Sequence, residues 1–113
     1  MSGTGFANTP KPPYYAVIFT SQRTEGDHGY GHMADRMFEL AAAQPGFLGF
    51  ESARTPDGLG ITVSYWVSEE SIAAWKAHAS HKVAQETGGR VWYSDYHVRV
   101  ARVERDYGKR PQA

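Results

Sequence analysis

Two histidines, His78 and His81, are the side chains best suited to acid–base chemistry in this sequence. Residues three positions apart lie on one face of a helix, so both imidazoles can serve one site. A positioned imidazole can act as general base or acid near neutral pH. We therefore predict both histidines as catalytic residues, with a structural or surface role as the alternative. Metal binding needs a third ligand that this pattern does not supply, so we expect no metal site.

Three side chains at alternate positions upstream, Thr62, Ser64 and Trp66, are predicted to bind substrate. Successive side chains of a strand point to opposite faces, so these three share one face. Small polar residues leave room beside them, and a tryptophan offers a flat wall and an indole donor. With Trp75 from the following helix they are expected to line a cleft between sheet and helices. The alternative places Thr62 and Ser64 at a wet sheet edge and Trp66 in the core.

Gln85 and Arg90 complete the predicted substrate-binding set. Arg90 follows two glycines and can close the site over an anionic oxygen. Aromatic residues make up 13% of the chain, which suits a planar hydrophobic ligand. The alternative is that these rings fill the core and an interface between subunits.

The elements that must position these residues follow from periodicity and from turn signals. Runs rich in β-branched and aromatic residues predict strands at 14–20, 47–54, 60–67 and 91–103. Helices are predicted from a cap at Asp27 to about residue 44, and from a cap at Ser68 to the glycine pair at 88–89. The order β-α-β-β-α-β predicts an α+β, ferredoxin-like fold whose four-stranded antiparallel sheet carries both helices on one face.

The other face of this sheet is expected to be apolar as well, because large apolar residues point both ways along the first, third and fourth strands. An apolar face of that size normally finds a partner. A chain of 113 residues forms one domain, here residues 14–107, with a flexible N-terminal arm at 1–13 and a C-terminal tail at 108–113.

Composition excludes several classes of function. The 12 basic residues balance the 12 acidic ones, so nucleic acid is not an expected partner. The chain has no cysteine, which removes disulfides and thiolate chemistry. It has no apolar run of membrane-spanning length, and its polar N-terminus lacks the apolar core of a signal peptide. We expect a cytoplasmic protein with no membrane partner.

Four short segments resemble the antibiotic biosynthesis monooxygenase family over about residues 14–107. They are SYW at 64–66, WKAHASH at 75–81, WY at 92–93 and ERDYG at 104–108. The resemblance implies a dimeric α+β barrel, in which two subunits pack their sheets face to face, and hence a homodimer.

The resemblance also bears on the reaction. In the quinone-forming branch, Trp66 matches a tryptophan of the third strand, whereas Thr62 stands in place of an asparagine and Ile72 in place of a tyrosine. In the heme-degrading branch, Trp75 matches a tryptophan of the second helix, but Gln85 stands where the axial histidine would be. The first strand also lacks the asparagine of that branch, so heme ligation in that manner is not expected.

We therefore expect a cofactor-independent monooxygenase that acts on a small aromatic ligand of the phenol or hydroquinone type. The chain has no P-loop and no G-x-G-x-x-G motif, and a flavin or nicotinamide domain does not fit its length. We expect no cofactor, because an electron-rich substrate ionised in a dry pocket can itself reduce dioxygen. The alternatives are a non-catalytic small-molecule binding protein on the same scaffold and a heme-handling protein.

Overall fold

The computed structural model describes residues 5–87 and 92–109, without the side chains of residue 81 and residues 83–87. Its elements, in chain order, are β1 (Tyr14–Arg23), α1 (Tyr30–Ala42), β2 (Phe47–Arg54), β3 (Leu59–Trp66), α2 (Glu69–Thr87) and β4 (Tyr93–Val103). This order confirms the predicted β-α-β-β-α-β pattern.

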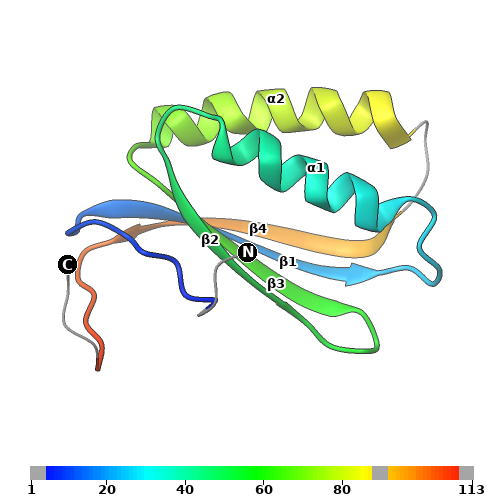
Figure 1. Ribbon diagram of the computed structural model, residues 1–113, viewed down its shortest axis with the longest axis horizontal. Helices are drawn as coiled ribbons and strands as arrows, with labels where there is room; N and C mark the ends of the chain where they lie inside the picture. The colour runs from blue at the N-terminus through cyan, green and yellow to red at the C-terminus, as the bar shows by residue number, and fades with distance from the viewer. Residues whose placement is uncertain (1–4, 88–91, 110–113) are drawn as a thin grey trace.

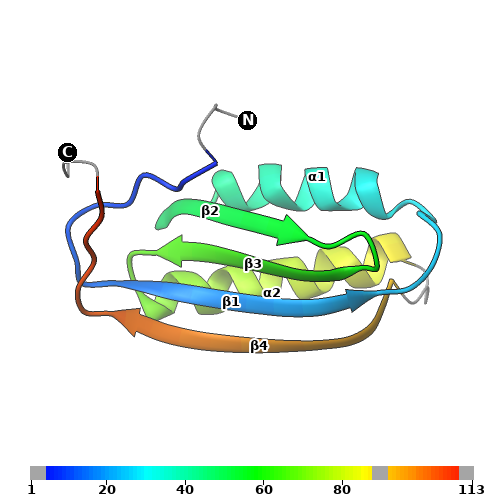
Figure 2. The ribbon, with the colours of Figure 1, turned by 90° about the horizontal axis from the view of Figure 1, so that it is seen from below.

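The four strands form one antiparallel sheet in the order β2-β3-β1-β4. Both helices cover the same face of this sheet (Figure 1). Seen from the opposite side, α2 lies behind β3 and β1, whereas most of β4 runs outside it (Figure 2). The ferredoxin-like α+β fold is thus confirmed, and the sheet has a helix-facing side and a far side. No helix among the described residues is long and apolar enough to cross a membrane.

The predicted helix starts differ in accuracy. Ser68 caps α2 as expected, because its Oγ accepts the backbone N–H of Ser71 at 3.1 Å. Helix α1 begins later than predicted, at Tyr30, after Gly29 adopts a left-handed conformation with φ 85°. Asp27 still helps to cap it, since its carboxylate accepts the N–H of Gly31 at 3.0 Å. The prediction found the capping side chain and misplaced the first helical turn.

The core lies between the helices and the sheet. Trp66 has no exposed surface and packs with Ala41 of α1 and Ile72 of α2. Met33 and Ala41 of α1 are buried as well. This packing fixes Trp66 on the helix-facing side, and alternation then places Ser64 and Thr62 there too.

The far side of the sheet is less uniformly apolar than predicted. It carries apolar side chains from β1 and β3, including Ile18, Ile61 and Val63. Between residues 95 and 100 of β4, however, alternation directs polar side chains to that side and apolar ones to the helices. The far-side residues of β4 from 95 onward are Asp95, His97, Arg99, Ala101 and Val103. The prediction of a wholly apolar second face was therefore wrong for β4.

The described part of the N-terminal arm contacts the far side of the sheet. The backbone N–H of Ala7 donates to Glu51 Oε2 at 3.0 Å, and Thr9 Oγ1 lies 3.0 Å from the hydroxyl of Tyr14. Tyr14 also donates to the carboxylate of Asp106, beyond the end of β4. Both extensions of the chain therefore meet at the same end of the sheet (Figure 1).

Candidate functional site

The three predicted side chains of β3 share the helix-facing side, but they are already engaged. The Trp66 indole Nε1 donates to Ser64 Oγ at 2.9 Å. Thr62 Oγ1 is hydrogen-bonded to Ser52 Oγ at 2.7 Å. Because Trp66 has no exposed surface, it belongs to the core, as the alternative interpretation expected for this residue. Thr62 and Ser64 do not lie at a sheet edge, because β3 has a strand on each side.

The predicted residues of α2 continue from this core toward solvent. Trp75 is half-buried and stacks on Trp66, with ring centroids 6.0 Å apart and planes 24° apart. The ring of His78 follows at 6.0 Å from Trp75 and is exposed. The side chains of His81 and Gln85, and the whole of Arg90, lie outside the described residues. The structure thus brings together Trp66, Ser64, Trp75 and His78 from the predicted set.

A further apolar surface, which sequence reasoning did not assign to the site, lies on the helix-facing side of β4. We call it the β4 strip; it consists of Tyr96, Val98 and Val100, which are 60%, 46% and 50% exposed. Their partners in the ladder, Ser21, Phe19 and Val17, establish the side on which they lie. The strip is open because most of β4 runs outside α2 (Figure 2). Alternation of apolar and polar residues from 95 to 101 was the signal that could have revealed it.

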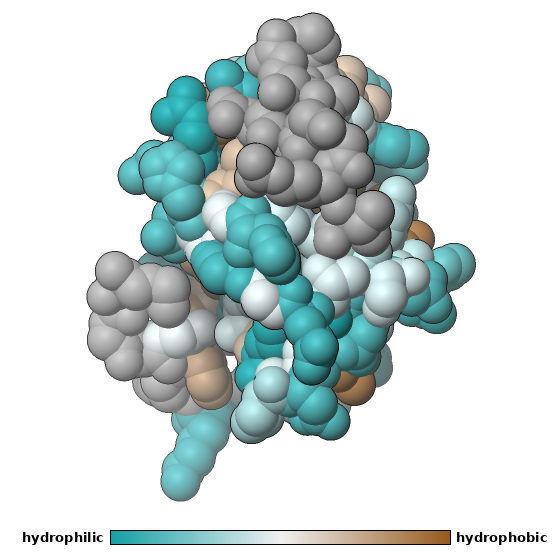
Figure 3. Space-filling model, turned by 90° about the vertical axis from the view of Figure 1, so that its right-hand side faces the viewer, coloured by the Kyte–Doolittle hydropathy of each residue, from teal (hydrophilic) through white to brown (hydrophobic). Residues whose placement is uncertain are grey.

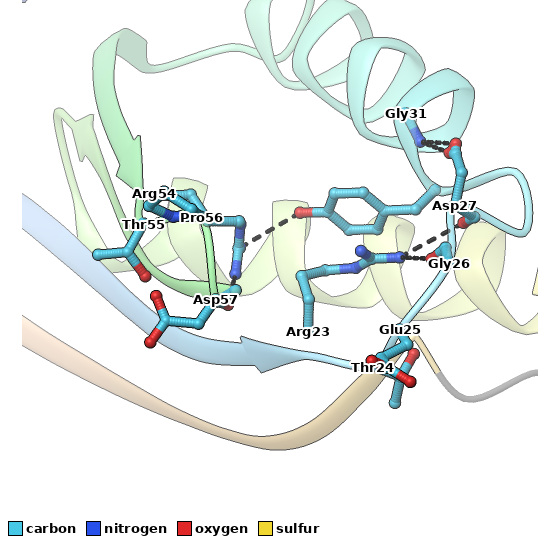
Figure 4. Close-up of a pocket in the computed structure, with 12 residues that line it drawn as sticks. Arg23, Thr24, Glu25, Gly26, Asp27, Gly31, Arg54, Thr55, Pro56 and Asp57 are labelled. Carbon is cyan, nitrogen blue, oxygen red and sulfur yellow. Dashed lines mark hydrogen bonds between the residues drawn. The ribbon is translucent and has the colours of Figure 1, made fainter.

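A pocket lies at the end of the sheet where β1 runs into the loop before α1. This pocket of about 580 Å³ is lined by residues 23–27, 30–31 and 54–58. Arg23 places its guanidinium carbon 3.7 Å from the centre of the Tyr30 ring, and Arg54 donates to the Tyr30 hydroxyl at 3.3 Å (Figure 4). The described surface at this end of the molecule is mostly hydrophilic (Figure 3). We call this hollow the arginine pocket.

Tyrosine hydroxyls link the arginine pocket to the neighbourhood of the β4 strip. The hydroxyl of Tyr93 donates to that of Tyr30 at 3.2 Å. The Tyr93 ring lies 5.3 Å from Phe19 and 6.3 Å from Tyr96, measured between centroids. Burial, and then the hydrogen bond with Tyr30, raises the pKa of Tyr93 above its ordinary value. Tyr93 therefore stays neutral at physiological pH and can donate its hydroxyl proton to Tyr30, which lines the arginine pocket.

A metal centre and a heme site are two further kinds of site in which histidine could serve as a ligand. The described residues contain no group of three or more His, Asp or Glu side chains arranged to hold a metal ion. The heme-degrading pattern requires an imidazole where this chain has Gln85, and an amide offers iron no comparable nitrogen ligand. His78 is exposed beside Trp75 rather than set over a flat slot. The residues present therefore do not fit that mode of heme binding.

Comparison with known proteins places this fold and sequence in context. The family model for antibiotic biosynthesis monooxygenases matches residues 13–87. The chain is 59% identical to the uncharacterized protein YqjZ of Bacillus subtilis over 99 residues, which is 88% of this chain and 87% of YqjZ.

Two solved structures are similar in fold at low sequence identity. SnoaB, a cofactor-independent oxygenase from Streptomyces nogalater, superposes with a TM-score of 0.69 at 13% identity, covering 86% of this chain and 98% of SnoaB. The heme-degrader MhuD from Mycobacterium tuberculosis superposes with a TM-score of 0.58 at 19% identity, covering 83% and 99% of the two chains. These likenesses confirm the fold, and the family model covers more than half of the sequence. The chain therefore belongs to the antibiotic biosynthesis monooxygenase family.

Proposed function

We propose that this protein is a monooxygenase that oxidises a small aromatic substrate without a cofactor of its own. The observation that carries the proposal is the β4 strip. It is an exposed apolar surface on the helix-facing side of the sheet, the same side on which Trp75 and His78 extend an aromatic row from Trp66. A flat apolar ligand can rest there with one face on the sheet and an edge toward α2, where binding removes its surface from water.

The chemistry that suits such a site uses the substrate as the source of electrons. Ionisation of an electron-rich phenol, hydroquinone or anthrone lets the carbanion or phenolate reduce dioxygen. For an anthrone, a CH₂ group becomes C=O, so one oxygen atom enters the substrate and the other leaves as water with the two hydrogens. The protein needs to supply a base, a fixed orientation and a dry surface.

His78 or His81 is the proposed base, and Trp75 with the β4 strip is the proposed ring-binding surface. Trp66 stacks against Trp75 and does not touch the ligand, because Trp66 has no exposed surface. Ser64 fixes the position of Trp66 by accepting its indole N–H, whereas Thr62 is bonded to Ser52 of β2. We further propose that the chain works as a cytoplasmic homodimer, with the far sides of two sheets packed together.

Oxygen uptake tests the proposal. Wild-type protein, freed of metals with chelator and given no flavin, is assayed with a panel of hydroquinones and anthrones. A positioned base contributes about 10²–10⁴-fold to rate, so His78→Ala or His81→Ala should lower kcat by such a factor with a modest change in KM. His32→Ala, an exposed histidine on α1, is the matched control and should retain full turnover.

Several outcomes would revise the proposal. Turnover that requires added flavin or iron would refute the cofactor-free scheme. Unchanged turnover in both α2 variants would remove histidine and make Tyr96, on the β4 strip, the next candidate. Failure to oxidise any substrate, with retained ligand binding, would favour a non-catalytic binding protein. A sharp one-to-one heme titration that is lost in His81→Ala would favour heme handling.

A further inference from the structure

The far side of β4 carries two charges of opposite sign, Asp95 and Arg99, with His97 midway between them. All three side chains are exposed. Within the part of the chain that the structure describes, neither Asp95 nor Arg99 has an ion-pair or side-chain hydrogen-bond partner. Four positions on an extended strand span about 13 Å, so the two charges do not neutralise each other. The face therefore presents a free acid and a free base at a fixed spacing.

One subunit alone offers these two charges no partner on its far side. In the ladder between β1 and β4, Asp95 lies beside Gln22 and Arg99 beside Ile18, which are both neutral. Among the described strand residues, alternation places one other charged side chain on this side, Glu51 of β2. Both oxygens of Glu51 already accept hydrogen bonds from its own subunit. A partner for Asp95 and Arg99 must therefore come from another molecule.

A second copy of this chain carries the matching charges in the matching order. In a contact with twofold symmetry, if residue i touches residue j of the partner, then j touches i as well. With the twofold axis near His97, two β4 strands face each other antiparallel, and Asp95 of each subunit lies opposite the partner subunit's Arg99. A parallel arrangement would instead place like charges opposite each other, which is unfavourable. The charge pattern thus selects one orientation of the two strands.

The side-chain lengths also suit this contact. Stacked sheets lie about 10 Å apart, a gap that a short carboxylate and a long guanidinium side chain can bridge together. An acid and a base that meet between two sheets avoid the cost of a buried, unpaired charge. We propose that the far side of β4 is a self-complementary contact between two copies of this chain, in which Asp95 of each subunit pairs with the partner subunit's Arg99. The proposal rests on the homodimer of the proposed function and names the residues that align its subunits.

The competing explanation is a solvated rim. β4 forms one edge of the sheet, whose far side faces the viewer in Figure 2. Charges on an edge strand can simply discourage pairing with other strands. Ion pairs at an exposed rim contribute little to affinity, so reversing either charge would then change dimerisation only slightly. The two explanations therefore differ in a measurable quantity, the dissociation constant of the dimer.

The test reverses one charge at a time in the full-length protein. Asp95→Arg sets two bases against each other at both contacts of the dimer, and Arg99→Asp sets two acids against each other. Each variant should raise the dimer dissociation constant by about tenfold or more at low ionic strength, measured by analytical ultracentrifugation. An equal mixture of the two variants should regain near wild-type association, because every contact in the mixed dimer again joins an acid to a base. The double variant Asp95→Arg/Arg99→Asp should do the same as a homodimer.

Matched controls separate this effect from folding and from net charge. Asp35→Arg and Arg36→Asp make the same exchanges at exposed positions of α1 and should leave dimerisation unchanged, alone or mixed. The neutral aromatic probe 1-naphthylacetamide reports on the β4 strip, and calorimetry should give unchanged binding in both β4 variants. If a reversed variant does not fold, Asp95→Asn and Arg99→Gln test the same pair. Their double variant should lose no more affinity than either single variant, because the pair is already broken.

The outcomes distinguish this contact from the rest of the account. A wild-type dimer that neither single reversal weakens would overturn the charge pair and leave the homodimer intact. Single variants that weaken the dimer but do not associate better when mixed would also overturn it. A monomeric wild type would refute the homodimer and this contact together. Recovery in the mixture without oxygen uptake would confirm the contact and count against the proposed oxygenase alone.

Discussion

At the scale of single residues, burial separates Trp66 from Trp75. Trp66 has no exposed surface and donates to Ser64, whereas Trp75 is half-buried at the edge of the same stack. Trp66→Ala should therefore lower the free energy of unfolding by about 3–5 kcal/mol, because it removes a large buried ring and leaves a cavity. Urea denaturation measures this loss.

Ser64→Ala provides the companion variant. It leaves the buried Trp66 N–H without its acceptor and should cost about 1–3 kcal/mol, without the cavity of the tryptophan variant. A Trp66→Ala protein of wild-type stability that fails to bind naphthylacetamide would contradict the core assignment. It would return Trp66 to the ligand-binding surface.

Tyr65, on the far side of the sheet, should make stability sensitive to alkaline pH. Its hydroxyl donates to Glu51 at 2.6 Å, and burial followed by this hydrogen bond raises its pKa above the usual value near 10. A raised folded-state pKa means that the stabilisation is complete below pH 10 and is lost as pH rises further. The free energy of unfolding should thus fall more between pH 9 and pH 11 in the wild type than in Tyr65→Phe.

The matched control for this pH effect is Tyr107→Phe, because Tyr107 is 84% exposed. Its alkaline loss of stability should equal that of the wild type. An equal loss in Tyr65→Phe would show that Tyr65 does not carry the effect. Tyr14, whose pKa is raised by burial and then by its bond to Asp106, would then be the residue to vary.

At the scale of elements, Ser68 shows what the sequence could predict. A serine before two glutamates and an apolar run is a local capping signal, and the structure has the expected bond to the Ser71 N–H at 3.1 Å. Ser68→Ala should lower the free energy of unfolding by about 1 kcal/mol, measured by urea denaturation. Ser80→Ala, at an exposed position within α2, should have no such cost. Similar losses in both variants would argue against a capping contribution.

The β4 strip was not predicted as part of the site, although its alternating pattern is visible in a short stretch of sequence. The alternation of Tyr96, Val98 and Val100 was visible in the sequence, but which side faces the helices depends on pairing with β1. Val98→Asp should weaken naphthylacetamide binding by about tenfold or more, because it places a charge on the apolar surface. His97→Asp introduces the same group one residue away on the far side and should leave this affinity unchanged. Equal losses would exclude the strip as the binding surface.

The arginine pocket lies beyond local sequence reasoning for a different reason. Arg23 ends β1 and Arg54 ends β2. Both approach the Tyr30 ring because β3 pairs with β1 on one side and with β2 on the other, which brings the β2–β3 hairpin to the end of β1. The Arg54 guanidinium also lies over Gly60, where a Cβ would collide with it, because the two residues are paired in the sheet. Strand type, helix caps and the fold class follow from short patterns, whereas this convergence requires the three-dimensional register.

At the scale of the whole molecule, the far side of the sheet should form the contact between two subunits. Ile61 is 47% exposed there, beside half-buried Val63 and Ile18. Sedimentation at low micromolar concentration should report about twice the chain mass of 12.5 kDa. Ile61→Asp should shift the protein toward monomer, since a buried unpaired charge is costly. Val98→Asp, on the helix-facing side, should remain a dimer; a monomeric wild type would end the barrel interpretation.

The central claim is that the helix-facing surface of this fold supports oxygen insertion into an aromatic substrate. The most direct measurement is mass spectrometry of the product formed from an anthrone under ¹⁸O₂, with chelator and without added flavin. The account predicts one ¹⁸O atom in each quinone product and a rate that falls sharply in Val98→Asp. Absence of quinone above the protein-free rate, or an inserted oxygen that comes from water, would contradict it.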